Sequence, residues 1–142
     1  MDKYAAANAE FSKFSRNYME LKKGLPVRPS EMGILNILAE TPGPHSSVML
    51  AELLGVSKPM ITAHVNALLE KGYITKQQSK EDKRVYYVLL TEKALQLVEE
   101  TKKDTKEQLE HMMDEIGQDS FDRLVALIHK VNQVLEESRT EK

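Results

Sequence analysis

The chain has 142 residues, enough for one domain with a hydrophobic core of its own. Its 20 Lys and Arg against 22 Asp and Glu leave a net charge of -2, which excludes a polybasic coat protein and an acidic tail. The absence of cysteine excludes disulfides, thiolate metal sites and cysteine nucleophiles. The longest wholly apolar run, residues 85–90, is far shorter than the roughly 20 residues of a membrane helix, and no basic-then-apolar leader opens the chain. We therefore expect a cytoplasmic protein.

Charge is distributed unevenly along the chain. Residues 57–84 contain six basic and three acidic side chains, whereas residues 91–142 contain eight basic and thirteen acidic ones. A basic middle followed by an acidic C-terminal part favours an anionic partner that meets only the middle of the chain.

The first elements in chain order are two helices. Over residues 4–25 apolar side chains recur at alternating spacings of three and four, a narrow heptad seam typical of a helix that packs on a partner helix. Pro26 should end this helix because it lacks the backbone donor. Proline in the first turn then predicts a second helix over residues 29–40, and the Thr-Pro-Gly-Pro run at 41–44 predicts a turn. The buried positions expected in the second helix are Met32, Leu35 and Leu38.

Two further helices joined by a tight turn follow. The first ends at Leu54 before Gly55 and begins at Ser46 or Ser47, either of which can act as its N-cap; its apolar positions are Leu50, Leu53 and Leu54. The second begins after Ser57, and its buried face is predicted at Ile61, Val65, Leu68 and Leu69. Its opposite face presents Pro59, Thr62, Ala63 and Asn66. This arrangement is a helix-turn-helix.

After Gly72 the pattern changes to that of strands. Residues 73–77 and 84–90 are rich in β-branched and aromatic side chains, and the polar residues 78–83 separate them, which predicts a hairpin with a charged tip. A hairpin directly after a helix-turn-helix is a wing.

Two long helices complete the chain. The first should start at Thr91 and end at Gly117, and the second should be capped by Asp119 or Ser120. Both carry apolar seams at helical spacing: Leu95, Val98, Thr105, Leu109, Met112 and Ile116 in the first, and Phe121, Leu124, Ile128, Val131 and Leu135 in the second.

The predicted fold is mainly α with a small β wing. In this order of elements the sequence resembles the MarR family of bacterial winged helix-turn-helix transcription regulators over essentially its full length. The resemblance is strongest in LAELLGVSKPMITAHVNALLEKGYI and in SKEDKRVYYVLLTEKA, where Asp82 and Arg84 lie six residues before Leu90-Thr91. It implies one domain over 1–142, with a winged-helix core at 29–90 and dimerisation helices at 1–28 and 91–142.

The resemblance also implies a homodimer that binds an inverted-repeat operator, acts as a repressor and is released by a small apolar or phenolic effector. The reading helix would enter the major groove, and Arg84 would reach the minor groove. Many relatives have arginine where Ala63 follows Thr62 here, so no relative's operator can be transferred. The dimer interface is expected at Tyr4, Phe11, Phe14, Tyr18, Leu109, Met112, Ile116, Phe121, Leu124, Ile128 and Val131.

Individual side chains are candidates for DNA contacts. The alternative for each of them is an ordinary exposed side chain with no role in DNA binding. Asp82 can hold the Arg84 guanidinium outward, and arginine suits a narrow, negative groove. Asn66 and Thr62 have functional groups for base edges. The remaining candidates, for phosphate or groove contacts, are Ser57, Lys58, Pro59, Ala63, His64, Lys80 and Lys83.

No feature of the sequence predicts a metal, a cofactor or a catalytic site. The four histidines lie at least 18 residues apart, so none forms an i, i+4 ligand pair, and the glycine and serine motifs of nucleotide and acyl-transfer sites are absent. The alternative to DNA binding is a winged-helix module that binds protein, such as an antirepressor. Ala63 in the reading helix favours it slightly, whereas the basic wing opposes it.

Overall fold

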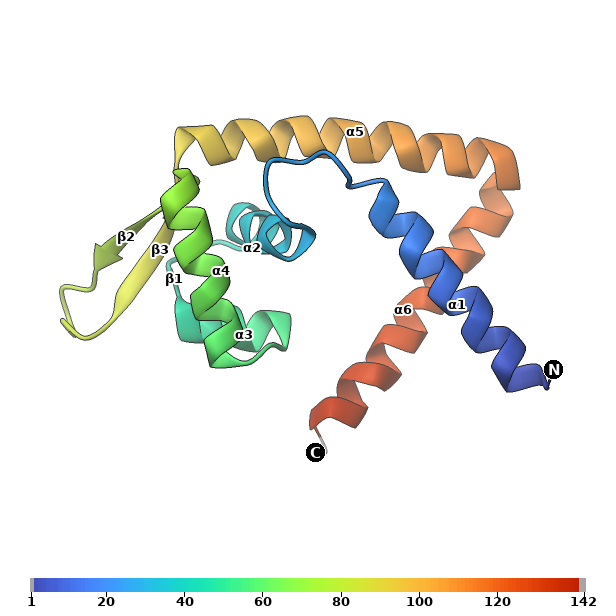
Figure 1. Cartoon of the computed structure of the whole chain (residues 1–142), viewed down its shortest axis with the longest axis horizontal. Helices are drawn as coiled ribbons and strands as arrows, with labels where there is room; N and C mark the ends of the chain where they lie inside the picture. Colours follow the sequence, from blue (N-terminus) through green and yellow to red (C-terminus); the bar gives the residue numbers. More distant parts are fainter. Residues whose placement is uncertain (1, 141–142) are drawn as a thin grey trace. The chain divides into compact units, whose positions relative to one another are not determined.

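The computed structural model describes residues 2–140 and is mostly helical with one small sheet (Figure 1). Contacts divide the chain into two compact units, residues 1–100 and residues 101–142. The helices of the first unit are α1 (Lys3–Glu20), α2 (Pro29–Glu40), α3 (Ser47–Leu54) and α4 (Lys58–Lys71). Its strands are β1 (His45–Ser46), β2 (Ile74–Gln78) and β3 (Tyr86–Leu90). Helix α5 (Glu92–Ile116) begins in this unit, and α6 (Gln118–Thr140) belongs to the second.

The helix-turn-helix has the predicted caps and glycine turns. The Ser57 hydroxyl accepts the Met60 N–H at 3.3 Å, and Ser46 rather than Ser47 caps α3 through the Met49 N–H. Gly55 has φ +66°, a left-handed conformation that glycine adopts without a Cβ clash. These local signals set the turn between α3 and α4.

The core of the first unit lies between α2, α3, α4, the sheet and the start of α5. Its fully buried side chains include Leu35, Leu50, Ile61 and Val88. Leu53 was named with Leu50 among the apolar positions of this helix, but its side chain is 54% exposed, and the buried residues of α3 are Leu50 and Ala51. Ile34, which fell outside the predicted α2 pattern, is completely buried.

The sheet has the strand order β1-β3-β2 with antiparallel pairing throughout. The wing hairpin was predicted, with strand limits that differ from those observed by one or two residues. Strand β1 was not predicted: its two residues pair with Val88 and Tyr87 of β3, and two residues are too few to show a period of their own. Figure 1 shows the β2–β3 hairpin extending away from α3 and α4.

Three boundaries differ from the sequence-based expectation. Helix α1 ends at Glu20, before the predicted stop at Pro26. Thr91 caps α5 instead of starting it, since its hydroxyl accepts the Ala94 N–H. Helix α6 begins directly after Gly117, whose φ is +91° and whose carbonyl accepts the Phe121 N–H. The glycine therefore breaks one helix and opens the next, and the predicted caps Asp119 and Ser120 lie inside the first turn of α6.

No single helix within residues 2–140 is long and apolar enough to cross a membrane. Only α3 and α4 taken together pass on length and composition, and they meet at a bend of 115°.

A buried ion pair connects α2 to the end of α4. The Glu31 side chain is 3% exposed and accepts the Lys71 ammonium at 2.8 Å and the Arg28 N–H at 3.0 Å. Burial raises the pKa of Glu31, but the Lys71 and Arg28 donors outweigh it, and the pKa lies below its ordinary value. Ionised Glu31 therefore stabilises the fold above its unfolded pKa, and this contribution is lost as the pH falls through the folded pKa.

Glu31→Gln should lower the free energy of unfolding at pH 7 by about 1–3 kcal/mol, because a buried charge-assisted hydrogen bond is replaced by a weaker neutral one. The gap between wild type and variant should shrink as the pH falls from the ordinary pKa of a glutamate through the lowered pKa of folded Glu31, because the unfolded carboxylate takes up its proton first. Urea unfolding at pH 7 and pH 3.5 measures both quantities. The exposed Glu70→Gln is the matched control and should change stability by less than about 0.5 kcal/mol. A gap that is unchanged at pH 3.5 would contradict this role of the ion pair.

Candidate nucleic-acid interface

The outward face of α4 consists of short, uncharged side chains. Thr62, Ala63 and Asn66 are exposed, while Ile61 and Val65 on the opposite face are buried. The Thr62 hydroxyl donates to the Lys58 carbonyl at 2.9 Å, so its hydrogen is engaged within the helix. Thr62 can therefore offer a partner an acceptor oxygen or its methyl group, whereas the Asn66 amide can both donate and accept.

The start of α4 places two further candidates at the surface. Lys58 and Pro59 occupy the first turn after the Ser57 cap, and all three residues are exposed. Proline is tolerated there because its missing N–H would have no partner within the helix. His64 is half-buried and so presents less of its ring to a partner than its exposed neighbours do.

At the wing tip, Arg84 is held by Asp82 and still faces solvent. The Arg84 Nε and Nη2 atoms donate to the Asp82 carboxylate at 3.1 and 3.3 Å, and the Arg84 backbone N–H donates to it at 3.0 Å. These donors lower the pKa of Asp82. The Arg84 side chain remains 91% exposed. The expected local pair therefore forms, and it restrains the guanidinium without covering it.

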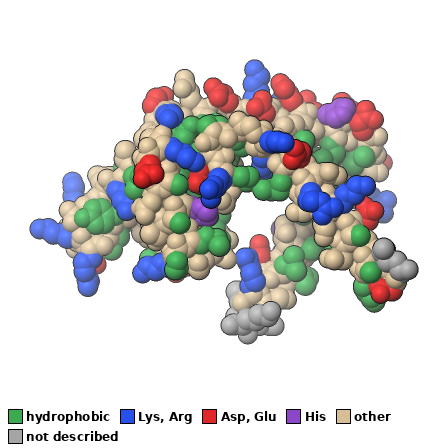
Figure 2. Space-filling view, in the orientation of Figure 1, with side chains coloured by type: hydrophobic (Ala, Val, Ile, Leu, Met, Phe, Trp, Pro, Cys, Tyr) green, Lys and Arg blue, Asp and Glu red, His purple; other side chains and the backbone are tan. Residues whose placement is uncertain are grey.

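The tip itself is an ordered turn. The hydroxyl of the buried Ser79 accepts the N–H groups of Glu81 and Asp82, both at 3.3 Å, and the Gln78 amide donates to the Lys83 carbonyl at 2.7 Å. Lys80 and Lys83 are exposed around this turn. Figure 2 shows Lys and Arg side chains projecting from the wing, at the left of the view.

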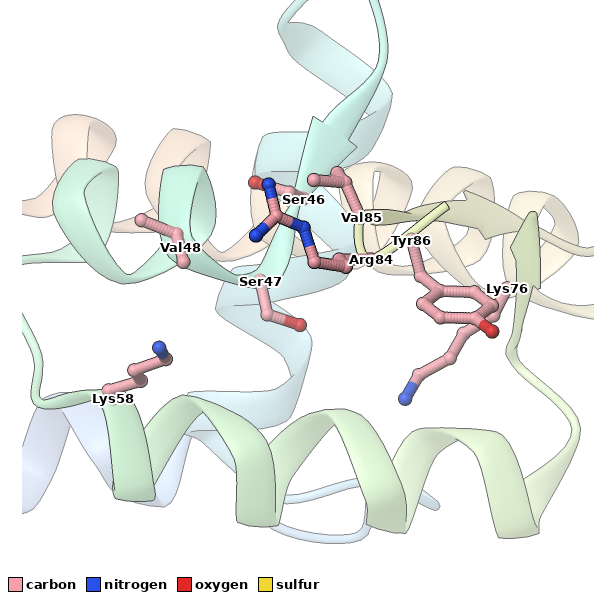
Figure 3. A pocket seen from close by; sticks show the side chains of 8 residues that line it. All are labelled: Ser46, Ser47, Val48, Lys58, Lys76, Arg84, Val85 and Tyr86. Carbon is pink, nitrogen blue, oxygen red and sulfur yellow. The ribbon is translucent and has the colours of Figure 1, made fainter. Parts of the chain in front are cut away.

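A groove of about 370 Å³ lies between the wing and the starts of α3 and α4 (Figure 3). On the helix-turn-helix side it is lined by Ser46, Ser47, Val48 and Lys58. On the wing side it is lined by Lys76, Arg84, Val85 and Tyr86. Three of these side chains are cationic and none is acidic, so the groove favours an anion.

A comparison with protein families gives one match, which covers this region. Residues 27–86, from just before α2 to the first residue of β3, match the model of the MarR family. The helix-turn-helix and β2 therefore resemble a MarR-family domain.

Solved structures resemble this chain over almost its whole length. A MarR protein from Peptoclostridium difficile is 24% identical with a TM-score of 0.82, and the match covers 95% of this chain and 90% of that one. FabT of Streptococcus pneumoniae in complex with DNA is 20% identical with a TM-score of 0.81, covering 95% and 99%. A MarR/EmrR family transcriptional regulator from Acinetobacter sp. ADP1 is 22% identical with a TM-score of 0.74, covering 96% and 99%.

At these identities the structural likeness establishes the winged-helix fold. Together with the match of residues 27–86 to the MarR family model, it confirms the resemblance to this family that was found in the sequence. Among residues 2–140, no three His, Asp or Glu side chains come together as a metal-binding group.

The helices outside the MarR-family match leave apolar side chains uncovered. In α1, no residue is buried; Tyr4, Phe11 and Phe14 are 80%, 71% and 45% exposed, and Phe14 stacks on the half-buried Tyr18 at 5.6 Å between ring centroids. In the second unit, Leu109, Met112, Phe121 and Leu124 are half-buried. The remaining predicted interface residues there are exposed: Ile116, Ile128 and Val131.

The groove contains residues that the sequence did not single out. Lys76 had been counted only in the charge of the middle segment, and Tyr86 only as a strand former. Both residues lie in strands that the sequence predicted. The groove, however, is also lined by Ser46 and Ser47, which lie beside the wing because β1 pairs with β3. No local signal indicated that juxtaposition.

Proposed function

We propose that this protein is a homodimeric regulator that binds duplex DNA in a sequence-specific manner and represses transcription. The observation that carries the proposal is that the exposed, uncharged polar face of α4 follows Lys58, which lines a groove with two further cationic residues and no acidic one. The relative FabT supports it, since its solved structure is a complex with DNA. In this proposal the protein acts in the cytoplasm, where its DNA is found.

In the proposed complex, α4 enters the major groove and Arg84 the minor groove. Asn66 and Thr62 read base edges, with Ser57, Pro59 and Ala63 close to the bases or their sugars. Asp82 orients Arg84. The cationic or partly exposed side chains contact phosphates, namely Lys58, His64, Lys80 and Lys83.

The dimer would read a pseudo-palindrome. Two reading helices related by a two-fold axis favour half-site centres roughly 10 base pairs apart, or one helical turn of DNA. The uncovered apolar side chains of α1, α5 and α6 support a second copy as the partner of these helices. We propose a single functional chain over 1–142, with 29–90 as the DNA-binding core and 1–28 and 91–142 as the dimerisation helices.

We also propose that a small apolar or phenolic effector releases the protein from DNA, as the resemblance to the MarR family implies. Selection of sites from random duplexes identifies the operator, and titration of its complex with phenolic compounds tests the release.

Arg84→Ala should weaken binding to every duplex and should make the slope of log K against log salt less negative by about one per subunit, because each wing loses one cation that lies in the minor groove between two rows of phosphates. The wild-type slope should be on the order of -5 to -9 if about 6–10 phosphates are neutralised. Preference for A·T-rich flanks should fall at the same time. Fluorescence anisotropy across a salt titration measures these effects, with the exposed Lys103→Ala of α5 as a control that should keep the wild-type slope.

An Arg84→Ala variant that binds the operator as tightly as wild type at every salt concentration would remove the wing from the interface. Wild-type binding that is insensitive to salt, or a selection that yields no preferred duplex, would contradict the DNA-binding proposal itself. Those outcomes would favour the protein-binding module.

A further inference from the structure

The groove between the wing and α4 combines unpaired positive charge with hydroxyl groups. Among residues 2–140, neither Lys58 nor Lys76 has a carboxylate within 4.0 Å, whereas Arg84 is already paired with Asp82. Figure 3 shows Lys76 and Tyr86 extending from the wing strands in the direction of α4, which begins at Lys58. The groove therefore has two free ammonium groups, one on each side.

The pairing of β2 with β3 explains why Lys76 and Tyr86 act together. Lys76 is paired with Val88, two residues from Tyr86 along β3, so the two side chains are diagonal neighbours on one face of the sheet. Tyr86 is 47% exposed, and its hydroxyl can donate a hydrogen bond. Ser46 and Ser47 contribute further hydroxyls from the opposite wall.

The walls also indicate what kind of anion fits. Val48 and Val85 line the same groove as the two lysines. A free inorganic ion makes no use of apolar walls, whereas a sugar-phosphate segment presents a charged phosphate together with the apolar edge of a deoxyribose. The groove volume of about 370 Å³ leaves room for such a segment.

We infer that this groove seats one phosphodiester of the DNA backbone, with Lys76 and Lys58 as its cationic ligands and the Tyr86 hydroxyl as a hydrogen-bond donor. The inference rests on the proposed DNA binding, in which Lys58 already contacts a phosphate, and adds Lys76 and Tyr86, which the sequence did not single out. Phosphate contacts position a protein on the duplex and carry no sequence information. Because this one lies between α4 and the wing, it would set the register of the reading helix relative to Arg84.

Lys76→Gln should weaken binding about tenfold on the selected operator and on random duplexes alike, and should make the salt slope less negative by about one per subunit. Lys76→Arg, which retains the charge, should restore most of the slope. Lys76 is exposed, so both variants should melt like wild type. Lys103→Gln, far along α5 from the groove residues in sequence, is the control and should bind as wild type does.

Neutral methylphosphonate linkages locate the phosphate. Each linkage of the operator is replaced in turn, and the loss of affinity is measured for wild type, Lys76→Gln and the wing-tip variant Lys80→Gln. At one linkage in each half-site, the neutral replacement should lower the affinity of wild type and of Lys80→Gln. It should not lower the affinity of Lys76→Gln further, because this variant lacks the ammonium that would bind that phosphate.

Several outcomes would overturn the inference. If Lys76→Gln keeps the wild-type affinity and slope, or shows no coupling to any linkage, the groove does not seat a backbone phosphate, although operator binding would stand. A second contrary outcome is that inorganic phosphate or phenyl phosphate binds wild type but not Lys76→Gln, while the two proteins have the same salt slope for DNA binding. The groove would then be a site for a free anion. If wild type binds no duplex at all, the proposed function fails and the inference fails with it.

Discussion

Val131→Asp should convert the protein from a dimer to a monomer and abolish operator binding. Val131 is 53% exposed within the chain and lies on the same face of α6 as Ile128, which is 39% exposed. If that face packs on a second copy, each subunit would bury an unpaired carboxylate. At about 2 kcal/mol for each of the two symmetry-related charges, the dimer dissociation constant should rise about 10³-fold.

Sedimentation velocity at micromolar concentration measures the association state, and anisotropy with the operator measures the loss of binding. Because Val131 is exposed in the single chain, the variant should retain helical circular dichroism. Gln133→Asp introduces the same charge on the opposite face of α6 and should remain a dimer. A wild-type protein that sediments as a stable, folded monomer would overturn the dimer proposal, and the exposed apolar seams would then need another partner.

Asn66→Ala should cost roughly 1–3 kcal/mol at each half-site, because a bidentate hydrogen bond to a base edge would be lost. Since a palindromic operator contains two half-sites, affinity for it should fall by about 30-fold to 10⁴-fold. Binding to random duplexes should remain nearly unchanged, since Asn66 carries no charge. Site selection with the variant should show relaxed preference at one position in each half-site.

The contrast with Arg84→Ala and Lys76→Gln separates base reading from backbone contact. Those two variants change the salt slope, whereas Asn66→Ala should leave it at the wild-type value. Gln133→Ala, which removes an exposed amide from α6, is the matched control and should have no effect. An equal loss on all duplexes would mean that Asn66 contacts only the backbone. An unchanged operator affinity would show that Asn66 makes no contact with the DNA.

Local sequence signals were sufficient for the helix-turn-helix and the wing. The Ser57 cap, the left-handed Gly55 and the polar tip between two strands each depend on neighbours within a few residues, and each is present in the structure. The pair of Asp82 and Arg84 was predictable for the same reason, because its members are close neighbours in the chain. Errors at element ends were small, as at Gly117, where the glycine opens α6 as well as ending α5.

The sequence by itself determined the order of the elements and the outward face of α4, because periodicity, caps and turns are local properties of the chain. Only the tertiary structure decided which apolar side chains are buried and which surface residues meet. Helical periodicity alone could not assign Leu53 to the surface and Ile34 to the core, since burial depends on what packs against each helix. The groove lined by Lys58, Lys76 and Tyr86 forms because β1 pairs with the wing strand β3 close to the start of α4. Such contacts between segments that are distant in the sequence follow from tertiary packing, which no local sequence pattern encodes.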